Sequence, residues 1–421
     1  MRQVNRSNLV ICLLVFGLCF YTVFAMAEDT ALDAVHITVE TEDWLDTGAS
    51  VGGVCAYCPA GSGEAVFTCP VTLTAAQPVA GTRLPQKSIA VAADGCVFDY
   101  PLFPGSDFAA YRSFELSNGG QDGIFTRIAD ALQTGLLADA MPGRLLVPAS
   151  KPVVVYINGE YYGQYMLREA MDEWTICRHE GLGEDRADEI RIVRGRGNVL
   201  QQKKDTGWDG VVARIGASNP GANQKDRAML EEAIDVSSFV DWLAAKVFFG
   251  DADPTSVVFY QLPGGKWKCA AWDFSLGLYT AAFDAANMYI TGENELASRF
   301  DQIVFRKILE IDQYRDLFLT RLAELRQKAT VETMQAKLDA CVAGIEPEMM
   351  KHFRRWAPLH DQTFVPEWPV DPVQAYDFWQ ARILRMRDKT IPARPGYVLE
   401  QVQAAFDLDE KEMQRYFGAE R

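Results

Sequence analysis

The chain has 421 residues, of which 48% are hydrophobic and 23% are charged. This is a globular composition, and the length favours a two-lobed domain or two packed domains over one small core. The formal net charge is −16, which argues against nucleic acid and anionic membranes as partners because their phosphates would be repelled. A protein or peptide substrate, especially a basic one, remains compatible.

The first 27 residues have the layout of an export signal. Arg2 and Arg6 form a positive start, residues 9–24 form an apolar run, and Ala25 and Ala27 frame a small-x-small cleavage site. The alternative is an uncleaved anchor, although the run is short for a hydrocarbon core of about 30 Å. We expect cleavage after Ala27, a secreted or cell-envelope location, and no membrane span in the mature chain.

Four cysteines gather early in the mature chain: Cys55, Cys58, Cys69 and Cys96. In an oxidising compartment such a group predicts disulfides, and four cysteines permit three pairings between which the sequence does not choose. The alternative is a zinc site built on the Cys-x-x-Cys pair, although the spacing to the other two cysteines matches no familiar zinc pattern.

The pattern of the first part predicts strands. Residues 28–116 read as β-rich, and Asp122 is placed to cap a helix from Gly123 to about Leu137. The clearest hairpin joins residues 153–157 to 160–167 through Asn158-Gly159, a dipeptide that suits a type I′ turn.

The second part reads as helical around one further hairpin. A helix from Ser237 to about Phe249 leads into a turn with Asp251 and Asp253. The hairpin follows over residues 257–272, and most of the chain from about 296 onward is helical in pattern. We therefore predict an α+β fold with a β-rich N-terminal part and a helix-rich C-terminal part.

The acidic residues around this hairpin indicate phosphoryl transfer. That chemistry needs a cation on the nucleotide phosphates, carboxylates for Mg²⁺, and a carboxylate that orients the attacking hydroxyl. Lys87 precedes an early strand, Asp251 and Asp253 precede the hairpin, and Asp273 ends it. A hairpin brings its two ends together, and Mg²⁺ prefers oxygen ligands. Taken alone, the pattern is more typical of turns and solvated strand ends.

Longer motifs resemble the CotH kinase family (spore coat protein H and its relatives). The segment VYINGEYYGQYMLRE, residues 155–169, is similar to the signature hairpin of that family, and residues 239–273 are similar to its second block. Residues 81–88, with Gly81-Thr82-Arg83, resemble its early lysine motif, and residues 114–127 resemble its helix-leading block. Order and spacing agree from about residue 35 to about residue 400.

The resemblance implies an atypical protein-kinase-like, two-lobed fold. The N-terminal lobe would span about 28–170, the C-terminal lobe 171–400, and a tail 401–421. It also implies an exported kinase that uses ATP with Mg²⁺ or Mn²⁺, phosphorylates Ser or Thr of a protein, and serves envelope or spore coat assembly. Carried over by position, Lys87 would contact phosphates and Glu169 would partner a lysine or a metal-linked network. Asp253 would be the base-like or metal-adjacent acid and Asp273 a magnesium ligand.

Two departures bear on activity. No Asn occurs between Asp253 and Asp273, where the family has one, and Ser275 stands where the family has a second carboxylate. A hydroxyl can ligate Mg²⁺ but brings no charge, and Asp251 is placed to compensate. The alternative is a pseudokinase that binds a nucleotide or a partner. A disulfide-stapled structural protein is a third possibility, but it leaves the long motifs unexplained.

Overall fold

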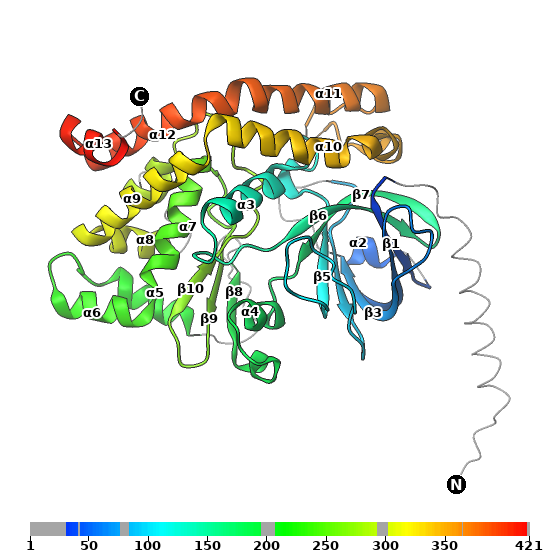
Figure 1. Ribbon diagram of the computed structural model, residues 1–421, viewed down its shortest axis with the longest axis horizontal. Helices are drawn as coiled ribbons and strands as arrows, with labels where there is room; N and C mark the ends of the chain where they lie inside the picture. The colour runs from blue at the N-terminus through cyan, green and yellow to red at the C-terminus, as the bar shows by residue number, and fades with distance from the viewer. Residues whose placement is uncertain are drawn as a thin grey trace, which may run out of the picture. The chain divides into compact units, whose positions relative to one another are not determined.

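The computed structural model describes residues 31–40, 43–75, 84–194, 207–292, 302–363 and 365–418 (Figure 1). The predicted signal segment lies outside the described residues, as does the Gly81-Thr82-Arg83 part of the lysine motif. No helix within the described ranges is long and apolar enough to cross a membrane. The structure is mixed α+β, with most strands in the first part and most helices in the second, as predicted.

The chain forms two compact units, and each is assembled from three stretches. Unit 1 contains the described parts of Met1–Asn118, Lys151–Arg168 and Gly344–Tyr376. Unit 2 contains the described parts of Gly119–Ser150, Glu169–Ala343 and Asp377–Arg421. The lobes implied by the family resemblance are contiguous ranges, whereas these units are not. Helix α12 (Ile391–Phe406) runs through residue 400, and α13 (Glu410–Phe417) lies within the range expected to be a tail.

Unit 1 is built on a closed barrel with strand order β1-β2-β3-β4-β5-β7-β6. Its strands are β1 (Asp33–Thr38), β2 (Ser50–Cys58), β3 (Phe67–Ala75), β4 (Ile89–Ala93), β5 (Ser113–Ser117), β6 (Ser150–Ile157) and β7 (Glu160–Glu169). Strand β1 pairs antiparallel with β2 and parallel with β6, which closes the ring. Closure leaves no strand edge free to pair with another chain. The strand-rich pattern was predicted, but its closure was not.

The hairpin of β6 and β7 confirms the predicted Asn-Gly turn. Asn158 has a φ of 50° and Gly159 a φ of 83°, the positive pair that a type I′ turn requires. The Asn158 side-chain oxygen also accepts a hydrogen bond from the Val39 backbone N–H at 2.9 Å. The turn residue therefore ties the hairpin to the chain just after β1.

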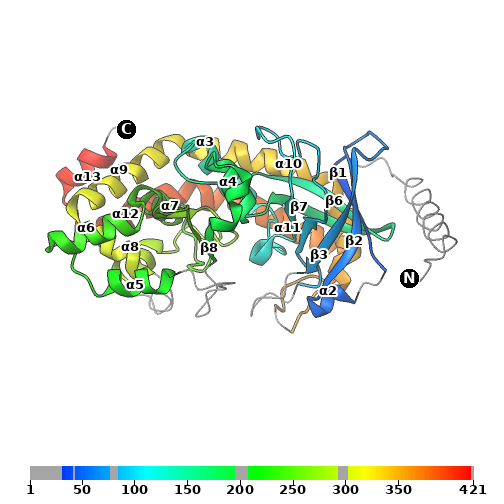
Figure 2. The ribbon, with the colours of Figure 1, turned by 90° about the horizontal axis from the view of Figure 1, so that it is seen from below.

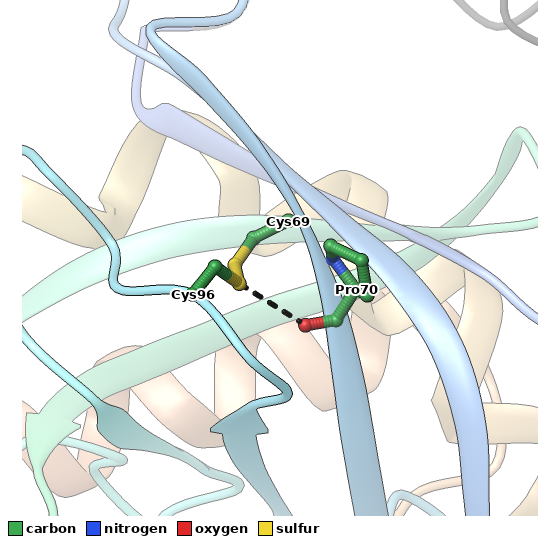
Figure 3. The surroundings of a disulfide bond; sticks show 3 residues. All are labelled: Cys69, Pro70 and Cys96. Carbon is green, nitrogen blue, oxygen red and sulfur yellow. Dashed lines mark hydrogen bonds between the residues drawn. A yellow bond between two sulfur atoms is a disulfide. The ribbon is translucent and has the colours of Figure 1, made fainter.

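One disulfide joins Cys69 of β3 to Cys96, with the Cα atoms 6.6 Å apart. Figure 3 shows the bond beside Pro70, whose carbonyl oxygen lies 3.5 Å from the Cys96 sulfur. Cys55 and Cys58 are buried free thiols. The bond occupies Cys69 and Cys96. In the part of the chain that the structure describes, no group of three or more His, Cys, Asp or Glu side chains could hold a metal, which argues against a zinc site built on Cys55 and Cys58. The bond also leaves two of the four clustered cysteines reduced.

Unit 2 contains a three-stranded antiparallel sheet of order β10-β9-β8 and most of the helices. Its strands are β8 (Arg191–Arg194), β9 (Val258–Gln261) and β10 (Trp267–Ala270), which confirms the second predicted hairpin. Its helices are α3 (Ala129–Ala140), α4 (Glu173–His179), α5 (Trp208–Gly216), α6 (Gln224–Ala233), α7 (Val236–Phe249), α8 (Gln302–Leu309), α9 (Asp312–Lys328), α12 and α13. Helices α10 (Val331–Trp356) and α11 (Pro372–Arg385) contribute to both units.

Helix α7 forms the core of unit 2 and confirms the predicted helix. Every residue of it except Ser237 is buried, and it packs against α9, α8, α12 and β10 (Figures 1 and 2). Asp235 caps its start by accepting from the Ser238 N–H at 3.1 Å. Gly250, with a φ of 62°, ends it, because glycine adopts the left-handed conformation at little cost.

Helix α3 begins later than predicted, at Ala129 rather than Gly123. Arg127 has a φ of 66°, which a continuous helix cannot contain. Asp122 nevertheless caps the helix from a distance, since its carboxylate accepts from the Thr126 and Ala129 N–H groups, each at 2.9 Å.

Gly163→Ala tests the packing of unit 1. Gly163 has a φ of +130°, and a Cβ there would lie 2.7 Å from Trp356 Nε1 and 3.0 Å from Gln86 Nε2. We expect a loss of about 2 kcal/mol or more in the free energy of unfolding, measured by urea denaturation. Gly52→Ala is the control, because nothing lies within 4 Å of its Cβ position. If Gly163→Ala and Gly52→Ala lost the same free energy of unfolding, the close packing of Gly163 against Trp356 and Gln86 would be contradicted.

Asp241→Asn tests the buried acid of α7. The Asp241 side chain is fully buried, and its Oδ1 lies 3.2 Å from Arg321 Nε. Burial raises the pKa of Asp241 from 3.8 to about 6, and the positive charge of Arg321 opposes this shift. An acid with a raised folded-state pKa loses its contribution to stability as pH rises from about 4 to 6. Relative to the parent, the variant should therefore gain about 1–3 kcal/mol between pH 4 and pH 7, as measured by urea denaturation. The exposed Asp46→Asn is the control, and a pH-independent difference would refute this.

Candidate functional site

The acidic turn after α7 is organised by a fully buried ion pair. Lys246 Nζ lies 2.8 Å from Asp251 Oδ1, and neither side chain is exposed. The same Nζ lies 4.3 Å from the ring centre of Phe274 and 5.3 Å from that of Trp242. Burial raises the pKa of Asp251 to about 6, and Lys246 opposes that shift. Asp251 is therefore paired with Lys246 and holds the turn, whereas the sequence suggested a role in compensating for the missing carboxylate.

Asp253 follows with its carboxylate held in one orientation. Its N–H donates to Asp251 Oδ1 at 2.9 Å. Its Oδ1 accepts from the Thr255 N–H at 2.8 Å and from the Thr255 hydroxyl at 2.6 Å, and its Oδ2 accepts from the Ser256 hydroxyl at 2.9 Å. Ser256 thus uses a hydroxyl near the position where the family has an Asn. The carboxylate is half-buried and pre-oriented, as an acid that positions a substrate hydroxyl must be.

The turn after β10 brings Asp273 and Ser275 together. Asp273 adopts a φ of 50°, and its Oδ1 accepts from the Ser275 N–H at 3.3 Å. The Ser275 hydroxyl oxygen is buried with no hydrogen-bond partner. Gly120 approaches both, because a Cβ on it would lie 3.4 Å from Ser275 Oγ and 3.7 Å from Asp273 Oδ1. A larger residue at 120 would crowd this site.

Helix α3 anchors the same turn. Asp130 Oδ1 accepts from the Phe274 N–H at 2.7 Å. The amide of Gln133, itself fully buried, donates to the carbonyl oxygens of Phe274 at 2.9 Å and Gly277 at 3.0 Å. Since Lys246 contacts both the Asp253 carbonyl at 3.3 Å and the Phe274 ring, the two acidic turns are neighbours in unit 2.

Arg394 of α12 secures the end of α7. It is fully buried and donates to the carbonyl oxygens of Val247, Phe248, Ala281 and Phe283 at 2.6–2.9 Å. Burial lowers its pKa to about 10. A buried guanidinium is tolerated when carbonyl oxygens satisfy its donors. These bonds fix the direction in which the chain leaves α7 toward Asp251.

Glu169, at the end of β7, pairs with His179. It is 1% exposed, and its Oε2 accepts from the Ala149 N–H at 2.8 Å and lies 3.1 Å from His179 Nε2. Its Oε1 is buried without a hydrogen-bond partner. Ala149, whose N–H donates to Glu169, lies three residues after Leu146, which forms a bridge with Ala270 of β10. The partner of Glu169 is a histidine, whereas a lysine or a metal-linked network was expected.

Lys87 belongs to unit 1, whereas the acidic candidates belong to unit 2. It lies two residues before β4, where its Nζ donates to the Leu84 carbonyl oxygen at 3.4 Å. Its own carbonyl oxygen accepts from the Tyr165 hydroxyl at 2.6 Å. The lysine motif is therefore tied to the signature hairpin within unit 1.

The donor set fits a hard cation in part. Among the described residues no group of three or more His, Cys, Asp or Glu side chains is arranged to hold a metal. Asp273 and Ser275 nevertheless offer adjacent oxygens, one of them a buried hydroxyl oxygen without a partner. Mg²⁺ commonly takes one or two protein oxygens and keeps water and phosphate as its other ligands. These two residues would hold it, and the ion would offset phosphate charge.

Sequence reasoning missed Lys246, Arg394 and Gln133. Lys246 carried a readable signal, because it is the single charge in the apolar run WLAAKVFF of a predicted buried helix, and such a lysine needs a partner. Arg394 and Gln133 carried no comparable signal. They act on backbone carbonyls more than 100 residues away, which no local pattern encodes.

An α+β fold in which acidic turns flank one hairpin has the features of a kinase-like protein. The chain matches the family described as CotH kinase protein over residues 81–386, most of its length. It belongs to the CotH kinase family. No curated protein is similar enough to the chain to count as a match.

Lys246→Met tests the buried pair. It leaves Asp251 buried without its partner, so we expect a loss of about 3–5 kcal/mol in the free energy of unfolding, measured in urea. The double variant Lys246→Met/Asp251→Asn should recover part of that loss, because no carboxylate is then stranded. A double variant as unstable as the sum of the two single variants would rule out direct coupling.

Proposed function

We propose that this protein is an exported kinase that transfers the γ-phosphoryl group of ATP to Ser or Thr of a protein. Family membership over most of the chain supports a kinase-like activity. The observation that carries the proposal is the Lys246 anchor, which fixes the Asp253 turn next to the Asp273 turn. In this proposal the two units correspond to the two lobes of a kinase, and the first 27 residues are a cleaved signal.

In this mechanism each acid has one task. Asp253 orients the substrate hydroxyl and accepts its proton, since its carboxylate is held by Thr255 and Ser256. Asp273 and Ser275 would hold Mg²⁺ or Mn²⁺, and the ion would offset the charge of the phosphates. The resemblance of its motif to that of the family supports a phosphate-contacting role for Lys87. A net charge of −16 favours a basic protein substrate, such as a coat or envelope protein.

A second candidate is a pseudokinase that binds a nucleotide or a partner. Two observations favour it: the hydroxyl of Ser275 replaces a carboxylate, and Asp251 is already neutralised by Lys246. The site then has less negative charge with which to hold a second metal ion. A thermal shift with ATP and metal in the absence of turnover would identify this case.

Asp273→Asn and Ser275→Asp test catalysis. The mature protein is incubated with labelled ATP, Mg²⁺ or Mn²⁺ and a basic protein, and we expect phosphate transfer. Asp273→Asn should lower the rate at least about 100-fold, because charge stabilisation is the main catalytic effect in phosphoryl transfer. Ser275→Asp should raise it several-fold by adding a ligand charge.

The exposed Asp46→Asn, in unit 1, is the matched control and should leave the rate unchanged. Absence of transfer by both the parent and Ser275→Asp, with ATP binding intact, would overturn the kinase proposal in favour of the second candidate.

A further inference from the structure

Unit 2 has an open hollow beside the Asp273 turn, with an empty volume of about 340 Å³ including its mouth. We call it the α11 hollow. Residues from three parts of the chain line it, among them Asp122, Phe125, Ser275, Tyr279, Arg382 and Arg385. Two of these are arginines, Arg382 and Arg385.

The two arginines have no carboxylate partner among the residues that the structure describes. They are three positions apart on α11, so they share one face of the helix. Arg387, just beyond them, differs: it pairs with Asp339 at 2.9 Å and with Asp388 at 3.2 Å. The chain therefore neutralises the arginine outside the hollow and leaves the two inside it uncompensated.

Arg382 is held in place by aromatic rings. Its guanidinium carbon lies 4.9 Å from the ring centre of Phe125 and 4.8 Å from that of Phe378. Stacking engages the flat face of a guanidinium and leaves its in-plane N–H donors free to bind an anion. Positioning by stacking lowers the entropy cost of binding, as expected of a recognition residue.

Asp122, the acid on the wall of the hollow, forms no ion pair with either arginine among the described residues, and the two guanidinium charges outnumber its single carboxylate. Its carboxylate oxygens accept hydrogen bonds from the Thr126 N–H, the Thr126 hydroxyl and the Ala129 N–H, so they serve the cap of α3. Ser275 also lines the hollow, but its hydroxyl oxygen is buried and belongs to the proposed metal site. Among the described residues the hollow therefore offers an anion two guanidinium groups that have no ion-pair partner.

We propose that the α11 hollow binds the phosphate of a phosphoserine or phosphothreonine on a protein substrate that is already phosphorylated. A phosphate carries about −1.5 to −2 charges and three acceptor oxygens, and it matches the fork of an arginine in a bidentate manner. Tyr279, 47% exposed and packed edge-on against Phe125, offers an apolar contact for a neighbouring residue of the bound peptide. The kinase would thus favour substrates with an earlier phosphorylation nearby.

This inference rests on the proposed function for the source of the phosphate, but its test does not need turnover. Binding is measured by fluorescence anisotropy without ATP or metal. The probes are a labelled basic peptide with one phosphoserine and the same peptide with serine. If the protein transfers no phosphate, it can still bind the phosphopeptide, and if it does transfer phosphate, it can still fail to bind the phosphopeptide. The experiment therefore distinguishes a failure of the binding proposal from a failure of the kinase proposal.

We expect the phosphopeptide to bind at least about tenfold more tightly than its serine counterpart, and Arg382→Gln and Arg385→Gln each to weaken it about tenfold. Arg354→Gln is the control, because it removes the same charge from an exposed residue of unit 1. Arg385 is exposed, so its variant should keep the parent melting temperature and remain informative if Arg382→Gln fails to fold.

Equal binding of the two peptides, or phosphopeptide binding that survives Arg385→Gln, would overturn the proposal. If inorganic phosphate or ATP displaced the labelled phosphopeptide at concentrations as low as those at which unlabelled phosphopeptide does so, the hollow would not select a phosphate carried on a protein. Weak competition by both, with displacement by the unlabelled phosphopeptide, is the expected result.

Discussion

The buried contact between Lys246 and Asp251 is the constraint from which the acidic site is built. Two charges without solvent must satisfy each other. The turn that carries Asp251 therefore has one stable position relative to the helix that carries Lys246. The lysine also reaches the Asp253 carbonyl and the Phe274 ring. Both candidate catalytic turns therefore take their positions from one ammonium group.

The surroundings of α7 reinforce that constraint from the opposite side. Arg394 satisfies carbonyl oxygens at the end of the helix and in the following segment, while Gln133 of α3 does the same for the turn after β10. Each is a buried polar side chain whose donors are used by backbone acceptors. Such networks specify one arrangement because any displacement strands several polar groups. The carboxylates they support need little reorganisation before chemistry.

The structure shows the contacts of the two residues at which the chain departs from the family pattern. Near the position where the family has an Asn, the Ser256 hydroxyl donates a hydrogen bond to Asp253. The Ser275 hydroxyl oxygen, in the same turn as Asp273, is buried and has no hydrogen-bond partner. In the proposed kinase, the two acidic turns would therefore carry less negative charge than the family pattern has. The arginines of α11 add positive charge on the adjoining wall, within the same unit.

Local pattern was enough to predict both hairpins and the helix now seen at Val236–Phe249, because turn chemistry and hydrophobic periodicity act over a few residues. The family was predicted from the resemblance of longer motifs, and the family match confirms it. Local pattern could not predict the closure of the barrel, the choice of Cys69 and Cys96 as partners, or the late start of α3 at Ala129. Nor could it assign Lys246 to Asp251 or Arg394 to the end of α7. Those outcomes depend on which buried groups meet once the chain has folded, since a buried charge or an open strand edge is satisfied by whatever partner tertiary packing brings to it.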